Sequence, residues 1–335
     1  MRGGGHRSLV DRRIIVTTIC LAITARNEEQ ALPCCLRAML RSVAAAEAGM
    51  PLRFDVVVVA DDCTDRTAII AQSFSRVRVL TSAGGKVEAQ RRVANTTPFV
   101  VFSDADILVT ENTVTVVCQA MLDDQQLQIA YPRKQPLPPV RTTLLAKAIY
   151  CYNRVNGFQE PRRYFNGKFF AIRDWQVPTL EELRPRLSSL PADRFYDFHA
   201  GMRVDDIWLS RDILRRYGPV GIREVAGGEI WFRPSETFTG MYRTYHRMRL
   251  EIERLSKLLP ESAAAHQQRR YDREAVKRAS PSDRWLWRWF RIALGACRLR
   301  YGCEKFYYQR FSPTTCNSWK PIAETKQSLD IVHPA

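Results

Sequence analysis

The stretch FVVFSDADI, residues 99–107, decides the predicted fold, because an apolar run ends there in two carboxylates. Four consecutive β-forming residues, Phe99 to Phe102, predict a strand that is buried on both faces. In an open parallel sheet, ligands bind outside the carboxyl ends of the strands. Asp104 and Asp106 therefore lie where a divalent cation and a phosphate would be held, since hard cations prefer oxygen ligands. Taken alone, such a pair is more often a solvated acidic turn, so the surrounding sequence has to decide.

The composition is that of a globular protein. With 335 residues, of which 45% are hydrophobic and 26% charged, the chain can form one large or two modest domains. No apolar run reaches the roughly 18 to 20 residues that cross a bilayer, and no small-residue cleavage site follows the basic N-terminus, so we expect no signal peptide. The nine cysteines form no CxxC pair of the kind that binds zinc. We therefore expect a cytoplasmic protein with reduced cysteines.

The formal net charge is +16, and much of it comes from one segment. Residues 241–310 contain 17 Lys or Arg against 7 Asp or Glu, which is a net charge of +10. A basic surface of this kind favours anionic lipid, nucleic acid or a phosphorylated substrate. Composition does not distinguish among these three partners.

Predicted strands and helices alternate in the first part of the chain. β-forming runs predict strands, and the amphipathic or polar runs between them predict helices. We expect strands at residues 14–24, 54–60, 77–80, 99–103 and 129–131, and helices at 32–43, after 61–67, at 84–95 and at 113–121. Asp62 or Thr64 is expected to cap the second helix. This order predicts an α/β fold with a mostly parallel sheet and helices on both faces.

A proline-containing stretch, PRKQPLPP at residues 132–139, breaks this alternation and predicts the passage to a second region. There we expect a helix at 203–218 that is entered through two aspartates and closed by Gly218. From residue 236 onward the pattern is helical and basic. The other elements expected in these regions are helices at 142–154, 241–259 and 282–299 and strands at 164–172 and 222–232.

Polar residues follow four of the predicted strands, and they are TARNEE (24–29), DDCTD (61–65), GGK (84–86) and DAD (104–106). A parallel sheet brings the carboxyl ends of its strands to one edge. Four such ends together are typical of a nucleotide site. In that site Asn27, Glu29 and Asp62 would address base and ribose. Lys86 would meet a ribose or phosphate oxygen, and a metal on Asp106 would bridge a diphosphate.

In this order the motifs resemble the GT-A-fold glycosyltransferases of family 2. The match spans most of residues 14–215 and is carried by TARNEEQALPCCLRAM (24–39), VVVVADDCTDRTAIIAQ (56–72), GGKVEAQRRVAN (84–95), FVVFSDADILVTENTV (99–114) and VDDIWLSRDI (204–213). The resemblance implies a Rossmann-like fold. Residues 14–131 would bind the nucleotide sugar, 132–235 would bind the acceptor, and 236–335 would form a helical, basic C-terminal extension.

The resemblance also implies roles for individual residues. Asp104 and Asp106 would form the DxD motif that binds Mn²⁺ or Mg²⁺, with Asp106 the more direct ligand. Asp205 and Asp206 take the place of the family's Glu-Asp pair, whose second acid is the catalytic base. The resemblance therefore assigns the role of base to Asp206. Because Asp205 replaces the usual Glu, the choice of base between Asp205 and Asp206 stays open. The other residues expected to bind the nucleotide sugar are Thr24, Ala25, Asn27, Glu29, Asp61, Asp62, Lys86, Ala105, Asn166, Gly167, Arg243 and Arg247.

These residue types suit the chemistry independently of the family. A divalent cation stabilises the negative charge on a departing nucleoside diphosphate. A carboxylate within hydrogen-bond reach can take the proton of an attacking hydroxyl. Inversion at the sugar carbon is implied by the resemblance alone. Structural alternatives remain, namely helix-end acids for Asp205 and Asp206, a hairpin turn for Asn166-Gly167, and a solvated helix face for the arginines.

The predicted helix at 282–299 combines tryptophan with arginine. One stripe of this helix contains Trp285, Leu286, Trp289, Ile292, Ala293, Ala296 and Leu299, and its arginines lie mostly off that stripe. This pattern fits peripheral contact with the inner face of the cell membrane, which would help an enzyme that uses a lipid-linked acceptor. Packing on the catalytic domain and a dimer contact are the alternatives.

The predicted function is inverting transfer of a sugar from a nucleotide-diphosphate sugar to an acceptor hydroxyl. UDP-sugars are the favoured donors and GDP-mannose is the main rival. The acceptor would be a saccharide or a lipid-linked molecule, as in cell-envelope glycan or glycolipid synthesis. One alternative is a nucleotidyltransferase. That class needs a Gly-rich loop after the first strand, and TARNEE occupies this position instead. The other is a non-catalytic nucleotide- or nucleic-acid-binding protein, but the acidic strand ends would repel a phosphate backbone, so no nucleic-acid partner is expected.

Overall fold

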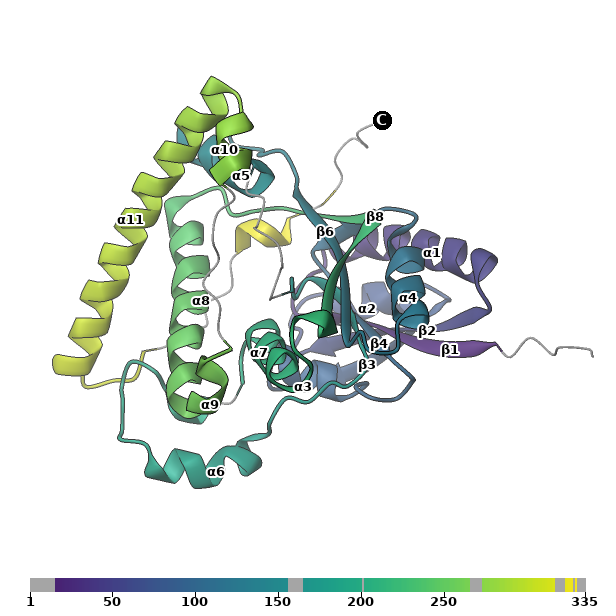
Figure 1. Ribbon diagram of the computed structural model, residues 1–335, viewed down its shortest axis with the longest axis horizontal. Coiled ribbons are helices and arrows are strands. Elements are labelled where there is room, and N and C mark those ends of the chain that lie inside the picture. The colour runs from purple at the N-terminus through teal and green to yellow at the C-terminus, as the bar shows by residue number, and fades with distance from the viewer. Residues whose placement is uncertain are drawn as a thin grey trace, which may run out of the picture.

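An eight-stranded sheet forms the centre of the computed structural model, which describes residues 16–155, 165–200, 202–265, 273–316, 323–327 and 329 (Figure 1). The strand order is β3-β2-β1-β4-β7-β6-β8-β5. The strands are β1 (Thr17–Ala25), β2 (Leu52–Asp61), β3 (Val77–Ser82), β4 (Val100–Asp104), β5 (Ile107–Val109), β6 (Ile129–Pro136), β7 (Phe169–Ile172) and β8 (Ile222–Phe232). Strands β3, β2, β1 and β4 pair in parallel, whereas β7 is antiparallel to both β4 and β6. The predicted α/β fold with a largely parallel sheet is therefore confirmed.

Helices cover both faces of the sheet, because successive side chains of a buried strand point to opposite sides. In β1, Leu21 and Ile23 pack with α1, α2 and α4, whereas Cys20 and Ala22 face the core that contains α3, α5, α7, α8 and α11. The helices are α1 (Leu32–Gly49), α2 (Thr67–Gln72), α3 (Lys86–Arg91), α4 (Thr113–Asp123), α5 (Leu144–Val155), α6 (Leu180–Ser189), α7 (Asp205–Tyr217), α8 (Phe238–Leu258), α9 (Pro260–Ala263), α10 (Arg273–Arg278) and α11 (Pro281–Arg310). Figure 1 shows α8 and α11 side by side, with α11 at the outer edge of the molecule.

Strand β4 has the burial that its sequence predicts. Val100, Val101 and Phe102 are buried, and the strand ends at Asp104, which is partly exposed. Because β1 and β4 pair in parallel, Thr24 lies beside Asp104 at the same edge of the sheet. The carboxyl end of this central strand therefore opens onto the edge where the polar strand ends meet.

The predicted interruption at residues 132–139 is wrong in its first half. Strand β6 continues through Pro132 to Pro136 and pairs in parallel with β8. The register shifts between Pro132 and Arg133, opposite a part of β8 that contains Gly227 and Gly228. Proline cannot donate a ladder hydrogen bond and is tolerated where pairing is irregular, so this shift lets the strand go on.

The predicted cap of the second helix is also wrong. The residue before α2 is Arg66, whose side chain makes no capping hydrogen bond. Asp62 has a φ of +51°, so the chain turns well before the helix begins. The amide and hydroxyl of Thr64 instead donate to the side-chain oxygen of Asn27. The cap prediction failed because this loop bonds to the end of β1.

Several other boundaries differ from those predicted. Helix α3 ends at Arg91, and β7 begins only at Phe169, after the turn at Gly167. Residue 164, the expected start of that strand, lies outside the described residues. Helix α11 extends beyond residue 299 to Arg310, and α6, which was not predicted, begins with a capping box. Helix α7 ends at Tyr217 and is closed, as predicted, by Gly218, whose φ is +71°.

Candidate active site

A pocket of about 1330 Å³ lies at the carboxyl ends of β1, β2 and β4. Its walls come from the loop before β7, from the first turns of α7, and from α5, α8 and α11. Ligand pockets of this kind commonly measure about 300 to 1,000 Å³. The pocket is therefore large enough for two substrates that meet at the sheet edge.

Most of the side chains predicted from the sequence reach this pocket. Those that line it are Thr24, Ala25, Asn27, Asp61, Lys86, Asp104, Ala105, Asp106, Asn166, Gly167, Asp205, Asp206 and Arg247. Glu29, Asp62 and Arg243 are not among the lining residues. The carboxylate of Glu29 accepts a hydrogen bond from the amide of Arg66, and that of Asp62 forms an exposed ion pair with Arg26. The structure thus brings together the strand ends and the first turn of α7, but the carboxylates of Glu29 and Asp62 do not line the pocket.

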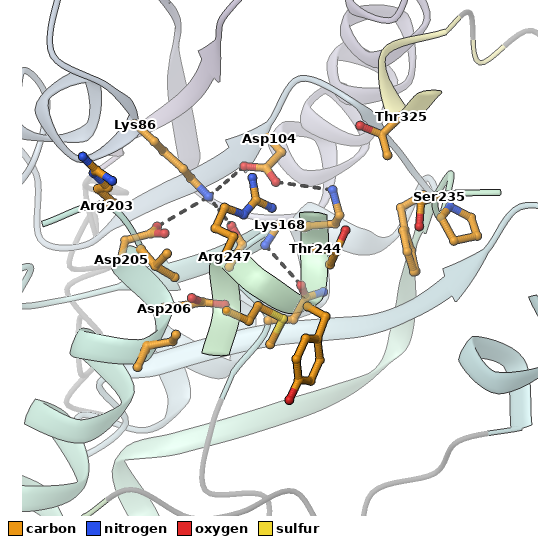
Figure 2. Close-up of a pocket in the computed structure, with 18 of the residues that line it drawn as sticks. Lys86, Asp104, Lys168, Arg203, Asp205, Asp206, Ser235, Thr244, Arg247 and Thr325 are labelled. Atoms are coloured by element: carbon orange, nitrogen blue, oxygen red, sulfur yellow. Dashed lines mark hydrogen bonds and ion pairs between the residues drawn. The ribbon is translucent and has the colours of Figure 1, made fainter. Parts of the chain in front are cut away.

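Lys86 links the acids of the sheet edge to α7 (Figure 2). Its Nζ lies 2.8 Å from a carboxylate oxygen of Asp104 and 3.5 Å from one of Asp205. The same ammonium donates to the carbonyl oxygen of Gly167 at 2.7 Å. Burial by itself would lower the pKa of Lys86, but the charges of Asp104 and Asp205 outweigh it and raise that pKa above its ordinary value. Lys86 therefore stays protonated and holds three segments in place.

Lys168 rests against both acids of the DAD sequence. Its Nζ lies 3.5 Å from Asp104 and 2.9 Å from Asp106. Burial raises the pKa of Asp104, but the neighbouring charges of Lys86 and Lys168 more than compensate and lower it overall. Asp104 is thus held ionised, with its oxygens at the pocket.

The donor set of Asp104 and Asp106 fits a hard divalent cation. Both side chains supply carboxylate oxygens, are only partly exposed and line the pocket. An ammonium group already lies against both of them, so the position attracts positive charge. Mg²⁺ is commonly held by one or two protein carboxylates together with substrate phosphates and water.

Asp205 and Asp206 have different surroundings although they are neighbours. The Asp205 side chain is 4% exposed and accepts a hydrogen bond of 2.6 Å from Nε2 of Gln90. The indole N–H of Trp175 in turn donates to the side-chain oxygen of Gln90. These contacts fix Asp205 in the interior, where it serves as a counter-ion for Lys86.

Asp206 carries the more unusual carboxyl group. Burial, reinforced by the charge of Asp205, raises its pKa from the ordinary 3.8 to about 6. A carboxylate with such a pKa is a better proton acceptor near neutral pH than an ordinary aspartate. Of the two acids, Asp206 therefore has the properties of a base.

Gly167 packs directly against Asp206. A Cβ atom at residue 167 would lie 2.9 Å from the Cβ of Asp206 and 3.1 Å from its Cγ, closer than real side chains approach. Glycine is required here because the backbone of the turn comes close to the acid. The turn thereby positions both Asp206 and, through its carbonyl oxygen, Lys86.

Sequence reasoning missed Glu28 as a residue of this site. Glu28 is 8% exposed, lines the pocket and lies 2.8 Å from Nζ of Lys326, which comes from the far end of the chain. Burial and the charge of Asp106 raise the pKa of Glu28 to about 7. The only local signal for Glu28 is the TARNEE sequence, and this sequence does not indicate whether Glu28 or Glu29 faces the pocket.

The chain matches the model of glycosyl transferase family 2 over residues 20–218, which is more than half of its length. Together with the largely parallel sheet and the acids at the end of β4, this match defines the class, and the chain belongs to glycosyl transferase family 2. The resemblance inferred from the sequence motifs is thereby confirmed. The protein is a glycosyltransferase.

Solved structures that resemble the chain include glucosyl-3-phosphoglycerate synthase from Mycobacterium tuberculosis. Its complex with Mn²⁺, UDP-glucose and phosphoglyceric acid has 19% sequence identity and a TM-score of 0.44, and the match covers 72% of this chain and 80% of that one. Its complex with Mg²⁺ and UDP has 18% identity and a TM-score of 0.45, with 72% and 79% covered. A further structure, described as that of a mycobacterial protein, has 18% identity and a TM-score of 0.43, with 72% and 75% covered. No curated protein matches the chain significantly in sequence.

Proposed function

We propose that the protein transfers a sugar, with inversion, from a nucleotide-diphosphate sugar to an acceptor hydroxyl. One arrangement carries this proposal. The acid pair Asp104 and Asp106, the partly buried Lys86 and Asp206, whose carboxyl pKa is raised, all line one pocket. Family membership favours glycosyl transfer over the nucleotidyltransferase and binding-protein alternatives. UDP-sugars are the favoured donors, with GDP-mannose second.

The residues of the sheet edge would bind the donor. Asp104 and Asp106 would hold Mg²⁺ or Mn²⁺, which when bound stabilises negative charge on the departing diphosphate. Lys86 and Lys168 add two ammonium groups beside these acids, and Asn27 and Asp61 line the part of the pocket at the ends of β1 and β2. The nucleotide would therefore lie over β1, β2 and β4, with its phosphates toward the acids.

Asp206 would act as the base. It would take the proton of the acceptor hydroxyl as the oxygen attacks the sugar carbon from the side opposite the leaving group. Asp205 would act indirectly, since Gln90 and Lys86 already engage its carboxylate. Gly167 would hold Asp206 in position. This division of roles assigns proton removal to the second acid of the pair.

The test is a panel of nucleotide sugars with Mg²⁺ or Mn²⁺, in which release of nucleoside diphosphate is measured for the wild type, Asp106→Ala and Asp206→Asn. We expect one donor class to be turned over by the wild type. Both variants should lose at least about 100-fold in kcat, Asp206→Asn because a positioned acid-base group is removed, and Asp106→Ala because a ligand of the cation is lost. Unchanged turnover in both variants would show that the site residues are misassigned.

We also propose that the acceptor is lipid-linked, as in cell-envelope glycan or glycolipid synthesis, and that α11 lies on an anionic membrane surface. Trp285, Trp289, Ile292 and Leu299 are between 40% and 72% exposed. Phe290 lies on the opposite face of the helix, and this face lines the pocket. No helix in the described part of the chain is long and apolar enough to span a bilayer. We propose peripheral contact, which would place the pocket close to the lipid surface.

A further inference from the structure

Three side chains that are able to ligate a metal meet in the C-terminal region. They are His246 on α8, Glu304 on α11 and Cys316 in the segment that follows α11. One ligand atom from each lies within 4.8 Å of the other two. None of the three lines the pocket that contains Asp104 and Asp106. The cluster is therefore separate from the cation site expected for sugar transfer.

His246 provides an independent reason to infer an ion. Its side chain is 6% exposed, and within the described residues its Nε2 atom has no hydrogen-bond partner, although buried polar atoms normally have one. The Oε1 atom of Glu304 is 3.9 Å away, which is too far for a hydrogen bond. Two ligands at about 2.0 to 2.1 Å from one tetrahedral zinc ion lie about 3.4 Å apart. The observed separation therefore suits an intervening ion better than direct contact.

The surroundings of the cluster also suit a bound cation. The rings of Phe195, Tyr242 and Tyr301 surround the imidazole of His246, with centroids 5.4 to 5.8 Å from it. The hydroxyl of Tyr242 donates a hydrogen bond to Glu304, and such outer contacts orient metal ligands. A thiolate from Cys316 and a carboxylate from Glu304 supply two negative charges, which balance a divalent ion.

We propose that His246, Glu304 and Cys316 bind one zinc ion that fastens the C-terminal helices together. Nitrogen, sulfur and oxygen donors are the set that Zn²⁺ accepts, whereas the all-oxygen pair Asp104 and Asp106 suits Mg²⁺ or Mn²⁺. Binding displaces the thiol proton of Cys316, because the thiolate is the ligand. The fourth position is taken by water or another donor. Since α8 and α11 both line the pocket, the ion fixes one wall of the active site.

The test uses the full-length protein, stripped with a chelator and titrated with Zn²⁺ or Co²⁺. All variants carry Asp106→Ala, so that the acid pair at the sheet edge contributes little to binding. We expect one tightly bound zinc ion per chain, a thiolate-to-cobalt charge-transfer band with Co²⁺, and a rise of several degrees in Tm on metal addition. Cys316→Ser should abolish the band and lower zinc affinity at least tenfold. Cys303→Ser, which changes an exposed cysteine of α11, should leave both unchanged.

Two outcomes would overturn the proposal. One is the absence of a charge-transfer band from the protein with both cysteines intact. The other is equal zinc affinity with and without Cys316→Ser. If Cys316→Ser does not fold, the proposal is tested by the charge-transfer band of the parent protein and by the zinc affinity of Glu304→Gln, which is a milder change. Because sugar transfer is not the readout, failure of the donor panel would leave this result unaffected.

Discussion

Asp206 holds its proton more tightly than an ordinary aspartate, because burial and the charge of Asp205 both oppose its ionisation. Its folded pKa of about 6 exceeds the ordinary 3.8, so folding is favoured by protonation. This contribution is complete below about pH 4 and is lost as the pH rises through about 6. At neutral pH the ionised acid therefore destabilises the fold.

Asp206→Asn should accordingly stabilise the protein at pH 8 and have little effect near pH 4. One pKa unit corresponds to about 1.4 kcal/mol, and partial exposure to solvent reduces the effect, so we expect a gain of about 1 to 2 kcal/mol. Denaturant unfolding without metal or nucleotide, at several pH values, measures it. Asp123→Asn, at the exposed end of α4, is the matched control and should show no such pH dependence. An equal effect of Asp206→Asn at both pH values would contradict the assignment.

Gly167→Ala tests the close approach of the turn to Asp206. The added Cβ would lie 2.9 Å from the Cβ of Asp206, so either the turn or the acid must move. Displacing a catalytic group by about 1 Å costs on the order of 100-fold in rate, and we expect such a loss in kcat with the fold retained. Gly295→Ala is the control, because a Cβ there meets nothing within 4 Å. It should keep full activity and stabilise α11 by up to about 1 kcal/mol.

Helix α11 presents two apolar faces. Phe290, Cys297 and Tyr301 are buried, with the ring of Phe290 stacked on Tyr152 of α5 at 3.7 Å. The exposed face contains Trp285, Trp289, Ile292, Leu299 and Phe306. Sequence periodicity predicted one stripe, but Leu286 and Ala293 of that stripe pack toward the core. The structure thus separates residues that hold the helix from residues available to a partner.

Charge distinguishes a membrane from a second copy of the chain as that partner. The exposed charged residues of α11 include Arg284, Arg288, Arg291, Arg298, Arg300 and Arg310, whereas its two acids, Asp283 and Glu304, are both hydrogen-bonded within the fold. Two such helices would repel each other, whereas anionic lipid would attract them. The exposed face therefore fits a membrane surface better than a dimer contact.

Flotation with vesicles tests this element. We expect the wild type to float with vesicles that contain anionic lipid, less so at high salt, and not with zwitterionic vesicles. Trp289→Ser combined with Ile292→Ser should reduce binding at least tenfold. Val220→Ser, which changes a residue that is 62% exposed outside α11, should not. A wild type that remains in the soluble fraction at low salt would contradict membrane contact.

The whole molecule places its pocket between the sheet edge and the C-terminal helices. A nucleotide that binds there should stabilise the folded state, by about 2.7 kcal/mol at a ligand concentration of 100 times Kd. We therefore expect UDP with Mn²⁺ to raise Tm, and Asp106→Ala to abolish the shift. Asp62→Ala is the informative control. The side chain of Asp62 is exposed and does not line the pocket, so the rise in Tm should persist. A loss of this rise would instead support the contact between Asp62 and the nucleotide that the sequence predicts.

The sequence by itself determined the alternating order of the first half, the buried strand β4 and the acids at its end, because local periodicity and turn residues specify these features. Only the tertiary structure decided which member of each neighbouring pair faces the pocket, Glu28 or Glu29 and Asp61 or Asp62. A change of one residue in a turn reverses the direction of a side chain, and the backbone bonds between loops set that turn. Tertiary structure alone also brought Lys326 to the segment that follows β1 and gathered His246, Glu304 and Cys316, because contacts between distant segments leave no periodic trace in the sequence.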